Sequence, residues 1–228
     1  MVTTLYLIRH GATEGSETKR YKGSIDVPLS EQGVLQVRAS AEYILSHLRN
    51  TCHARRQSYL TDVHGAAASG EPSAGLRAVY SSGLRRAVQS AAIIAGAHGV
   101  TPLVYHGLRE RSFGIWEGMT FAEIKERYPA EFEAWAGNPL KYSPVDGEST
   151  LEVRERVLEA LEAIVAGHRG DNIAIVAHGG VNRIILCHIL GVPLENIFRL
   201  EQDFAAVNVI EFWDKYPVVK LLNGGIDQ

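Results

Sequence analysis

Three short polar segments of the sequence share one pattern, in which an apolar run ends at a glycine-bearing turn. Segment 9–11 (Arg-His-Gly), segment 81–86 (Ser-Ser-Gly-Leu-Arg-Arg) and segment 178–180 (His-Gly-Gly) each follow such a run. In open parallel sheets, ligands bind at the carboxyl ends of the strands. If the three runs are neighbouring strands, two histidines and at least two arginines converge on one pocket. Guanidinium groups beside helix N-termini suit a compact dianion such as phosphate.

The two adjacent arginines, Arg85 and Arg86, cannot both reach such a pocket. Successive helix residues are about 100° apart, so one arginine faces the site and the other faces solvent.

Two histidines and a glutamate could also bind a metal ion instead of a phosphate. Guanidinium groups would repel a divalent cation and attract a phosphate. The sequence therefore predicts a phosphate site with no metal and no cofactor.

The composition is that of an ordinary globular protein. The 228 residues are 46% hydrophobic and 21% charged, with a net charge of −3. This charge argues against a generally basic nucleic-acid binder. Cys52 and Cys187 are the only cysteines, too few for a disulfide scaffold or a thiolate metal cage. The length predicts one domain over residues 1–228.

No targeting or membrane-spanning segment is visible in the sequence. The first apolar run ends at Arg9, and the apolar stretch 184–190 is interrupted by His188. A spanning helix needs about 20 apolar residues. We therefore expect a cytoplasmic protein whose partner is a small-molecule phosphate ester, with no binding to nucleic acid or membrane.

Short β-branched runs alternate with amphipathic ones, a pattern typical of an α/β fold. Capping-box spacing at Thr120/Glu123 and at Ser149/Glu152 indicates helix starts between the third and fourth strands. We expect strands at 5–8, 78–80, 103–105, 173–177, 207–212 and 218–222, and helices at 30–49, 84–95, 181–190 and after Ser149.

These elements predict a three-layer α/β/α sandwich with a mostly parallel sheet and a small helical lid at about 106–150. Residues 50–75 have little periodicity and are rich in Ala, Ser, Gly and Arg, which indicates a long irregular surface loop. The late strand pair is also a candidate edge for a homodimer.

The order and spacing of the motifs resemble the histidine phosphatase superfamily, also called the phosphoglycerate mutase-like family, over almost the whole chain. The matching blocks are 7–11 (Leu-Ile-Arg-His-Gly) with Gly23, Asp26, Pro28, Leu29, Ser30 and Gly33, then 81–87, 108–110, 113–114, 116–118, 147–149 and 176–180.

The resemblance implies a role for individual residues. His10 is the nucleophile that becomes phosphohistidine, and Glu110 is the general acid and base. Arg9, Arg86 and His178 hold the phosphoryl oxygens. The family pattern makes Arg86, not Arg85, the inward arginine. The resemblance also places Gly23, Gly179 and Ser16 in the phosphate-binding set. Gly179 and Gly11 let the backbone approach the phosphate. At the position of Ser16, many members carry a longer Asn.

The resemblance further implies a metal-independent phosphomonoester hydrolase that acts on a small phosphorylated metabolite. Segment 20–23 with Trp116, Trp135 and Pro139 favours the α-ribazole phosphatase or broad-specificity branch, hence α-ribazole 5'-phosphate as a candidate substrate. A phosphoglycerate mutase and a non-catalytic phosphate-binding protein are the alternatives. Most lid aromatics are expected in the lid core: Phe113, Trp116, Phe121, Phe132, Trp135 and Tyr142.

Overall fold

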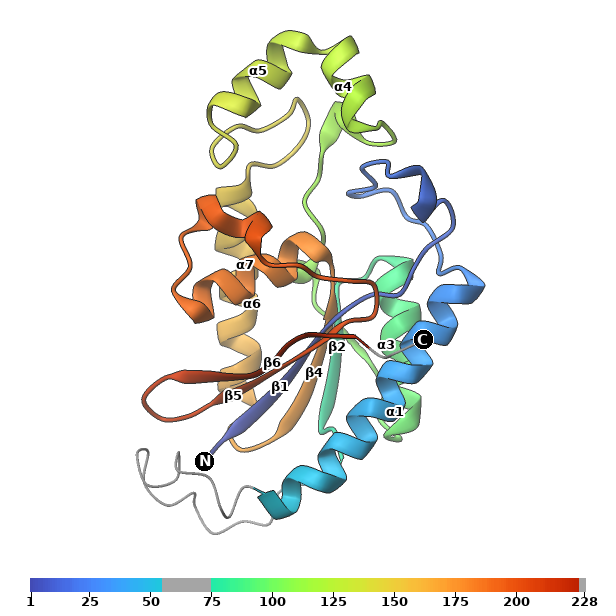
Figure 1. Cartoon of the computed structure of the whole chain (residues 1–228). Helices are drawn as coiled ribbons and strands as arrows, with labels where there is room; N and C mark the ends of the chain where they lie inside the picture. Colours follow the sequence, from blue (N-terminus) through green and yellow to red (C-terminus); the bar gives the residue numbers. More distant parts are fainter. Residues whose placement is uncertain (55–74, 226–228) are drawn as a thin grey trace.

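The computed structural model describes residues 1–54 and 75–225. Its centre is a six-stranded sheet of order β3-β2-β4-β1-β5-β6 (Figure 1). The strands are β1 (Thr3–Arg9), β2 (Ala78–Ser81), β3 (Leu103–Val104), β4 (Asn172–Ala177), β5 (Val207–Phe212) and β6 (Pro217–Gly224). The first four pair in parallel, whereas β5 is antiparallel to both β1 and β6. The predicted mostly parallel sheet is confirmed.

Helices cover both faces of the sheet, because the side chains of its central strands alternate between them (Figure 1). In β1, Tyr6 and Ile8 pack toward α1 (Glu31–Ala54) and α3 (Arg85–Ala97). Leu5 and Leu7 pack toward the opposite face, covered by α6 (Thr150–Gly167) and α7 (Gly179–Leu190). All four β1 side chains are fully buried. The predicted α/β/α layering is therefore confirmed.

Helix α1 begins where predicted and ends later than predicted. The Ser30 hydroxyl accepts a hydrogen bond from the Gly33 N–H at 3.1 Å, as an N-cap does. The helix continues to Ala54, so the predicted loop at 50–75 does not begin at 50. Residues 50–54 contain neither Gly nor Pro, so nothing in them breaks the helix. Positions 55–74 of that loop lie outside the described residues.

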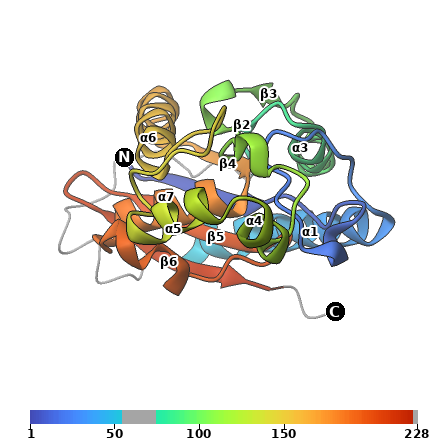
Figure 2. The same cartoon turned by 90° about the horizontal axis from the view of Figure 1, so that it is seen from above.

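The lid lies over the carboxyl ends of the parallel strands, as the view from above shows (Figure 2). It contains η3 (His106–Leu108), η4 (Gly114–Trp116), α4 (Phe121–Arg127) and α5 (Pro129–Gly137). Both predicted capping boxes are present, at Thr120 and Ser149. Trp116, Ile124 and Phe132 form the lid core, as expected for most of its aromatics. Phe121 is the exception, since 49% of its surface is exposed.

Two short 3-10 helices complete the rim of the lid region, η1 (Ser16–Thr18) and η5 (Leu194–Arg199). Within residues 1–54 and 75–225, no helix is both long and apolar enough to cross a membrane.

Candidate active site

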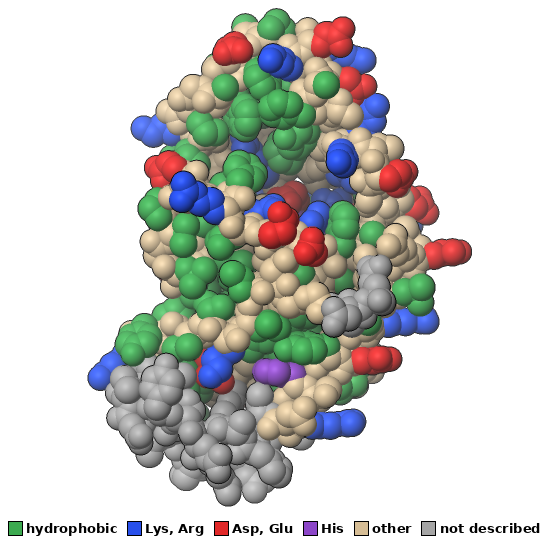
Figure 3. Space-filling model, viewed as in Figure 1, with side chains coloured by type: hydrophobic (Ala, Val, Ile, Leu, Met, Phe, Trp, Pro, Cys, Tyr) green, Lys and Arg blue, Asp and Glu red, His purple; other side chains and the backbone are tan. Residues whose placement is uncertain are grey.

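The sheet order brings the three polar segments of the sequence together. Strand β4 lies between β1 and β2, so the segments that follow these three strands meet at one edge. The ring centroids of His10 and His178 are 5.2 Å apart. Arg9, His10 and Arg86 line one end of a cavity of about 670 Å³. Figure 3 shows this hollow below the lid, with Lys and Arg as well as acidic side chains in and around it and hydrophobic side chains above it.

A backbone hydrogen bond fixes the tautomer of His10. Its Nδ1 donates to the Gly11 carbonyl oxygen at 2.7 Å, which requires the proton of the neutral ring to be on Nδ1. The lone pair of Nε2 is then available. Burial, followed by the charges of Arg86 and Arg9, lowers the pKa of His10 well below its usual value. The imidazole is therefore neutral near pH 7, as a nucleophile must be.

His178 is completely buried beside His10. Its Nε2 lies 2.7 Å from the Ser82 hydroxyl. Its Nδ1 is buried and has no hydrogen-bond partner among the described residues. Burial, then the neighbouring His10 and Arg86, lowers the pKa of His178 well below its usual value. Buried polar atoms are seldom left without a partner, so we expect a ligand beside His10 to complete the hydrogen bonding of His178.

The two adjacent arginines point in different directions. Arg86 is only 2% exposed, and its Nη1 and Nη2 donate to the carbonyl oxygens of Ile25 and Gly23 at 2.8 and 2.7 Å. Arg85 is exposed to solvent. The structure therefore places Arg86 inward, in agreement with the family pattern.

Arg9 is fixed from two sides. Its Nη1 donates to the Gln202 carbonyl oxygen at 2.5 Å, and its guanidinium lies 3.9 Å over the ring of Phe204. Its Nε is buried without a partner among the described residues. Burial lowers the pKa of Arg9 to about 10, so the group is still charged at neutral pH.

A buried pair of amides supports Arg9, and sequence reasoning missed it. Gln202 and Asn208 are fully buried and exchange two hydrogen bonds, of 3.0 and 2.8 Å. Asn208 also donates to the Leu7 carbonyl oxygen of β1 at 3.0 Å. The pair thus ties the backbone that holds Arg9 to the sheet. Asn208 stands inside the otherwise largely apolar run 207–212, and a polar residue at such a position could have identified the amide pair from the sequence. Nothing in the sequence around Phe204 indicates its contact with Arg9.

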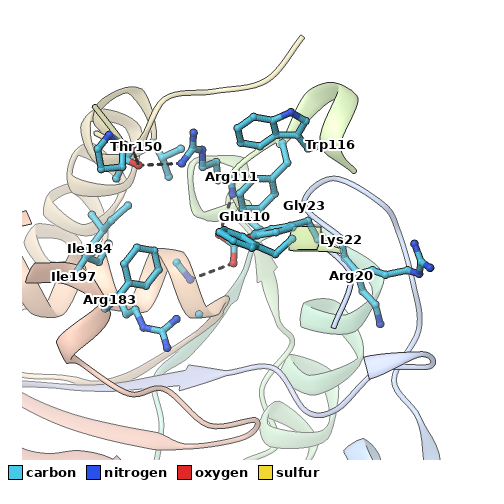
Figure 4. A pocket seen from close by; sticks show the side chains of 18 of the residues that line it. Arg20, Lys22, Gly23, Glu110, Arg111, Trp116, Thr150, Arg183, Ile184 and Ile197 are labelled. Atoms are coloured by element: carbon cyan, nitrogen blue, oxygen red, sulfur yellow. Dashed lines mark hydrogen bonds between the residues drawn. The ribbon is translucent and has the colours of Figure 1, made fainter. Parts of the chain in front are cut away.

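Glu110 lines the cavity and lies at the N-terminus of α7 (Figure 4). Its two carboxylate oxygens accept from the backbone N–H groups of Gly180 at 3.2 Å and Arg111 at 2.9 Å. A Cβ at Gly180 would come within 2.6 Å of this carboxylate, so a larger residue there would displace the Glu110 side chain. Arg156 donates a hydrogen bond to the Arg109 carbonyl oxygen at 2.7 Å and so supports the backbone just before Glu110.

The side chain of Arg111 turns away from Glu110 into the lid. It donates to the carbonyl oxygens of Glu148 and Tyr142 at 2.6 and 3.0 Å and to the Thr150 hydroxyl at 3.0 Å. It therefore connects the segment around Glu110 to the later part of the lid.

The predicted phosphate-binding residues differ in what they do. Ser16 lines the cavity, but its hydroxyl already bonds the N–H and the carbonyl oxygen of Thr13, both at 2.8 Å, so it closes this loop. The carbonyl oxygen of Gly23 accepts a hydrogen bond from Arg86, and the backbone of Gly23 has a φ of +45°, a conformation that favours glycine. A Cβ at Gly179 would lie 3.5 Å from the Arg9 Nε, so this backbone does adjoin the cation.

Gly11 also has a packing role. A Cβ at this position would collide with the carbonyl group of Gly33 in α1. Gly11 is therefore needed for close packing of the first turn against α1.

Lys22 is a cation of the site that the sequence motifs did not single out. It lines the cavity, and its Nζ donates to the Thr13 hydroxyl at 2.6 Å. Its charge contributes to the lowered pKa of His10.

Among residues 1–54 and 75–225, no group of three or more His, Cys, Asp or Glu side chains could hold a metal ion.

Comparison with known proteins supplies an independent observation. A family model described as the histidine phosphatase superfamily (branch 1) matches residues 5–53 and 64–224. A bifunctional protein of Mycobacterium tuberculosis is 34% identical over 222 residues, which cover 97% of this chain and 54% of that protein. The chain thus spans about half the length of this relative.

Two other proteins match along nearly their whole length. Phosphoserine phosphatase 1 of Hydrogenobacter thermophilus is 29% identical over 219 residues, 96% of this chain and 91% of the relative. The α-ribazole phosphatase structure from Shigella flexneri superposes with a TM-score of 0.78 at 21% identity, covering 99% of this chain and all of that one. The latter likeness establishes the fold alone.

Proposed function

We propose a function from one premise: the chain belongs to the histidine phosphatase superfamily. The predicted family is thereby confirmed, and phosphatases are among the relatives of this chain. The chain hydrolyses phosphate monoesters of small metabolites through a phosphohistidine formed on His10, without a metal ion. One observation carries this proposal: a buried neutral His10, with Nδ1 bound to Gly11 and Nε2 available, lies among Arg9, Arg86 and His178.

In the first step, the lone pair of His10 Nε2 attacks phosphorus and the bond from phosphorus to the ester oxygen breaks. Arg9, Arg86 and the Nδ1 of His178 hold the three non-bridging oxygens and stabilise their charge in the transition state. Glu110, in its acid form, gives its proton to the departing alkoxide, which leaves as the alcohol.

In the second step, Glu110 is a carboxylate and takes a proton from a water molecule. The resulting hydroxide forms a new bond to phosphorus, and the bond between phosphorus and Nε2 breaks. Inorganic phosphate leaves, and His10 and Glu110 regain their starting protonation states. The Gly11 carbonyl holds the Nδ1 proton through both steps.

The donor set supports a metal-free reaction. The phosphate end of the cavity presents guanidinium groups, which supply the positive charge that a metal ion would otherwise bring. Phosphoserine and α-ribazole 5'-phosphate are alternative candidate substrates, and the walls of the cavity decide between a small polar and a larger alcohol. A homodimer through the edge strand β6 is part of the same proposal.

A phosphoenzyme experiment tests the function. Brief mixing with ³²P-labelled p-nitrophenyl phosphate, followed by alkaline quench, should give an acid-labile phosphoryl group on His10. The variant His10→Ala should fold, bind no label and lose activity to a few per cent or less. Label on another residue, or substantial activity in this variant, would refute the assignment.

The lifetime of the phosphoenzyme separates hydrolase from mutase. A hydrolase should lose the label to water within one turnover time. A label that persists in water and is discharged only by 3-phosphoglycerate would establish the mutase instead. If the folded protein never forms the label, the remaining alternative is a non-catalytic phosphate-binding protein.

A further inference from the structure

The cavity extends well beyond the space that a phosphate needs. At the roughly 30 Å³ that one water molecule occupies in the liquid, the eleven non-hydrogen atoms of O-phosphoserine fill about 330 Å³. The cavity measures about 670 Å³. Its size lies within the range of about 300–1,000 Å³ that is typical of pockets for drug-sized molecules. An alcohol much larger than serine therefore fits above the phosphate.

The walls away from His10 and Arg86 are largely apolar. Phe198 of η5 is 75% exposed and Phe121 of α4 is 49% exposed, although proteins usually bury such side chains. Both line the cavity. Figure 4 shows Trp116 on one side and Ile184 and Ile197 on the other. The apolar lining further includes Ile124, Trp135, Leu140 and Leu194.

The arginines of these walls already bind protein acceptors. Arg20 pairs with Glu123 at 2.6 Å, and Arg183 pairs with Glu201 at 3.0 Å. Arg111 is held by acceptors of the lid and of Thr150 at the start of α6. A second anionic group on the substrate would have to compete with these partners. The walls thus favour apolar surface over a second charge.

Lys19 and Glu195 are the charged residues at the rim, and both are exposed. Water and salt screen charges in such positions, so they attract a ligand only weakly. The cavity therefore combines one strongly cationic end with a large apolar remainder.

We infer that the substrate is a phosphate monoester whose alcohol carries a large apolar, preferably aromatic, body. This inference rests on the proposed hydrolase function. The phosphate binds at the Arg9 and Arg86 end, and the body of the alcohol covers Phe198 and Phe121. Burial of these two rings against the substrate removes apolar surface from water, which stabilises the complex.

Three esters of primary alcohols test this inference with matched leaving groups: benzyl phosphate, 2-naphthylmethyl phosphate and O-phosphoserine. We expect kcat/KM to be at least about tenfold higher for the naphthylmethyl than for the benzyl ester, since apolar pockets discriminate on this scale. O-phosphoserine should be the poorest of the three. Phe198→Ser should lower the naphthylmethyl-to-benzyl ratio about tenfold, mainly through KM.

Leu35→Ser is the matched control, because Leu35 of α1 is also a large exposed side chain, 64% exposed, and does not line the cavity. It should leave all three values unchanged. The inference is overturned if O-phosphoserine is the best substrate, or if Phe198→Ser lowers all three values equally. If no ester is hydrolysed and no phosphohistidine forms, the proposed function itself has failed.

Discussion

Replacing Arg86 with alanine tests the phosphate end of the cavity, and the neighbouring Arg85 supplies the control. Arg86 is buried and directed inward by hydrogen bonds to Gly23 and Ile25, so its remaining donors face the phosphate position. Loss of one preorganised donor to a transition-state oxyanion costs about 2.7–4 kcal/mol. We therefore expect Arg86→Ala to lower kcat/KM for benzyl phosphate by about 10²–10³-fold.

Arg85→Ala should change kcat/KM by about twofold at most, because an exposed substitution usually changes free energies by less than about 0.5 kcal/mol. Arg86→Ala also leaves two carbonyl oxygens without their partner, at about 1–3 kcal/mol each if they stay dry. Urea unfolding of both variants measures this effect on stability separately. The reasoning is refuted if Arg85→Ala is the costlier change, or if folded Arg86→Ala keeps more than a fifth of the activity.

Glu110→Gln should slow hydrolysis of benzyl phosphate by about 10²–10⁴-fold. It should slow phosphoenzyme formation from p-nitrophenyl phosphate far less, because that leaving group needs no proton. Equal losses in rapid-quench assays of the two esters would show that Glu110 is not a general acid. His10 and His178 have lowered pKa values when folded, so below pH 6.5 the unfolded chain binds more protons and stability falls by up to about 1.4 kcal/mol per pH unit for each histidine. Urea unfolding at pH 7.5 and 5.5 should therefore show a steeper loss for the wild type than for His10→Gln, and equal slopes would contradict the buried neutral ring. Activity should survive exhaustive chelation and be inhibited by vanadate, whereas a loss restored by a divalent ion would show that a metal takes part.

Much of the fold could be predicted from local patterns. The uninterrupted apolar run 173–177 is β4 because a strand covered on both faces has no polar side. Thr120 and Ser149 start helices through capping boxes that need only four consecutive residues. The end of α1 was harder, because residues 50–54 are compatible with both helix and loop.

The kind of site could be inferred from the sequence, since histidines, arginines and glycines at the ends of apolar runs predict a phosphate pocket once those runs become neighbouring strands. The groups that complete the site depend on tertiary packing. Gln202 and Phe204 contact Arg9, and Asn208 bonds Leu7 and Gln202, although Arg9 and Leu7 lie about 200 positions away in the sequence. The apolar walls likewise arise where α4, α7 and η5 surround one cavity. No periodicity along the chain encodes such contacts, because they depend on how distant elements pack.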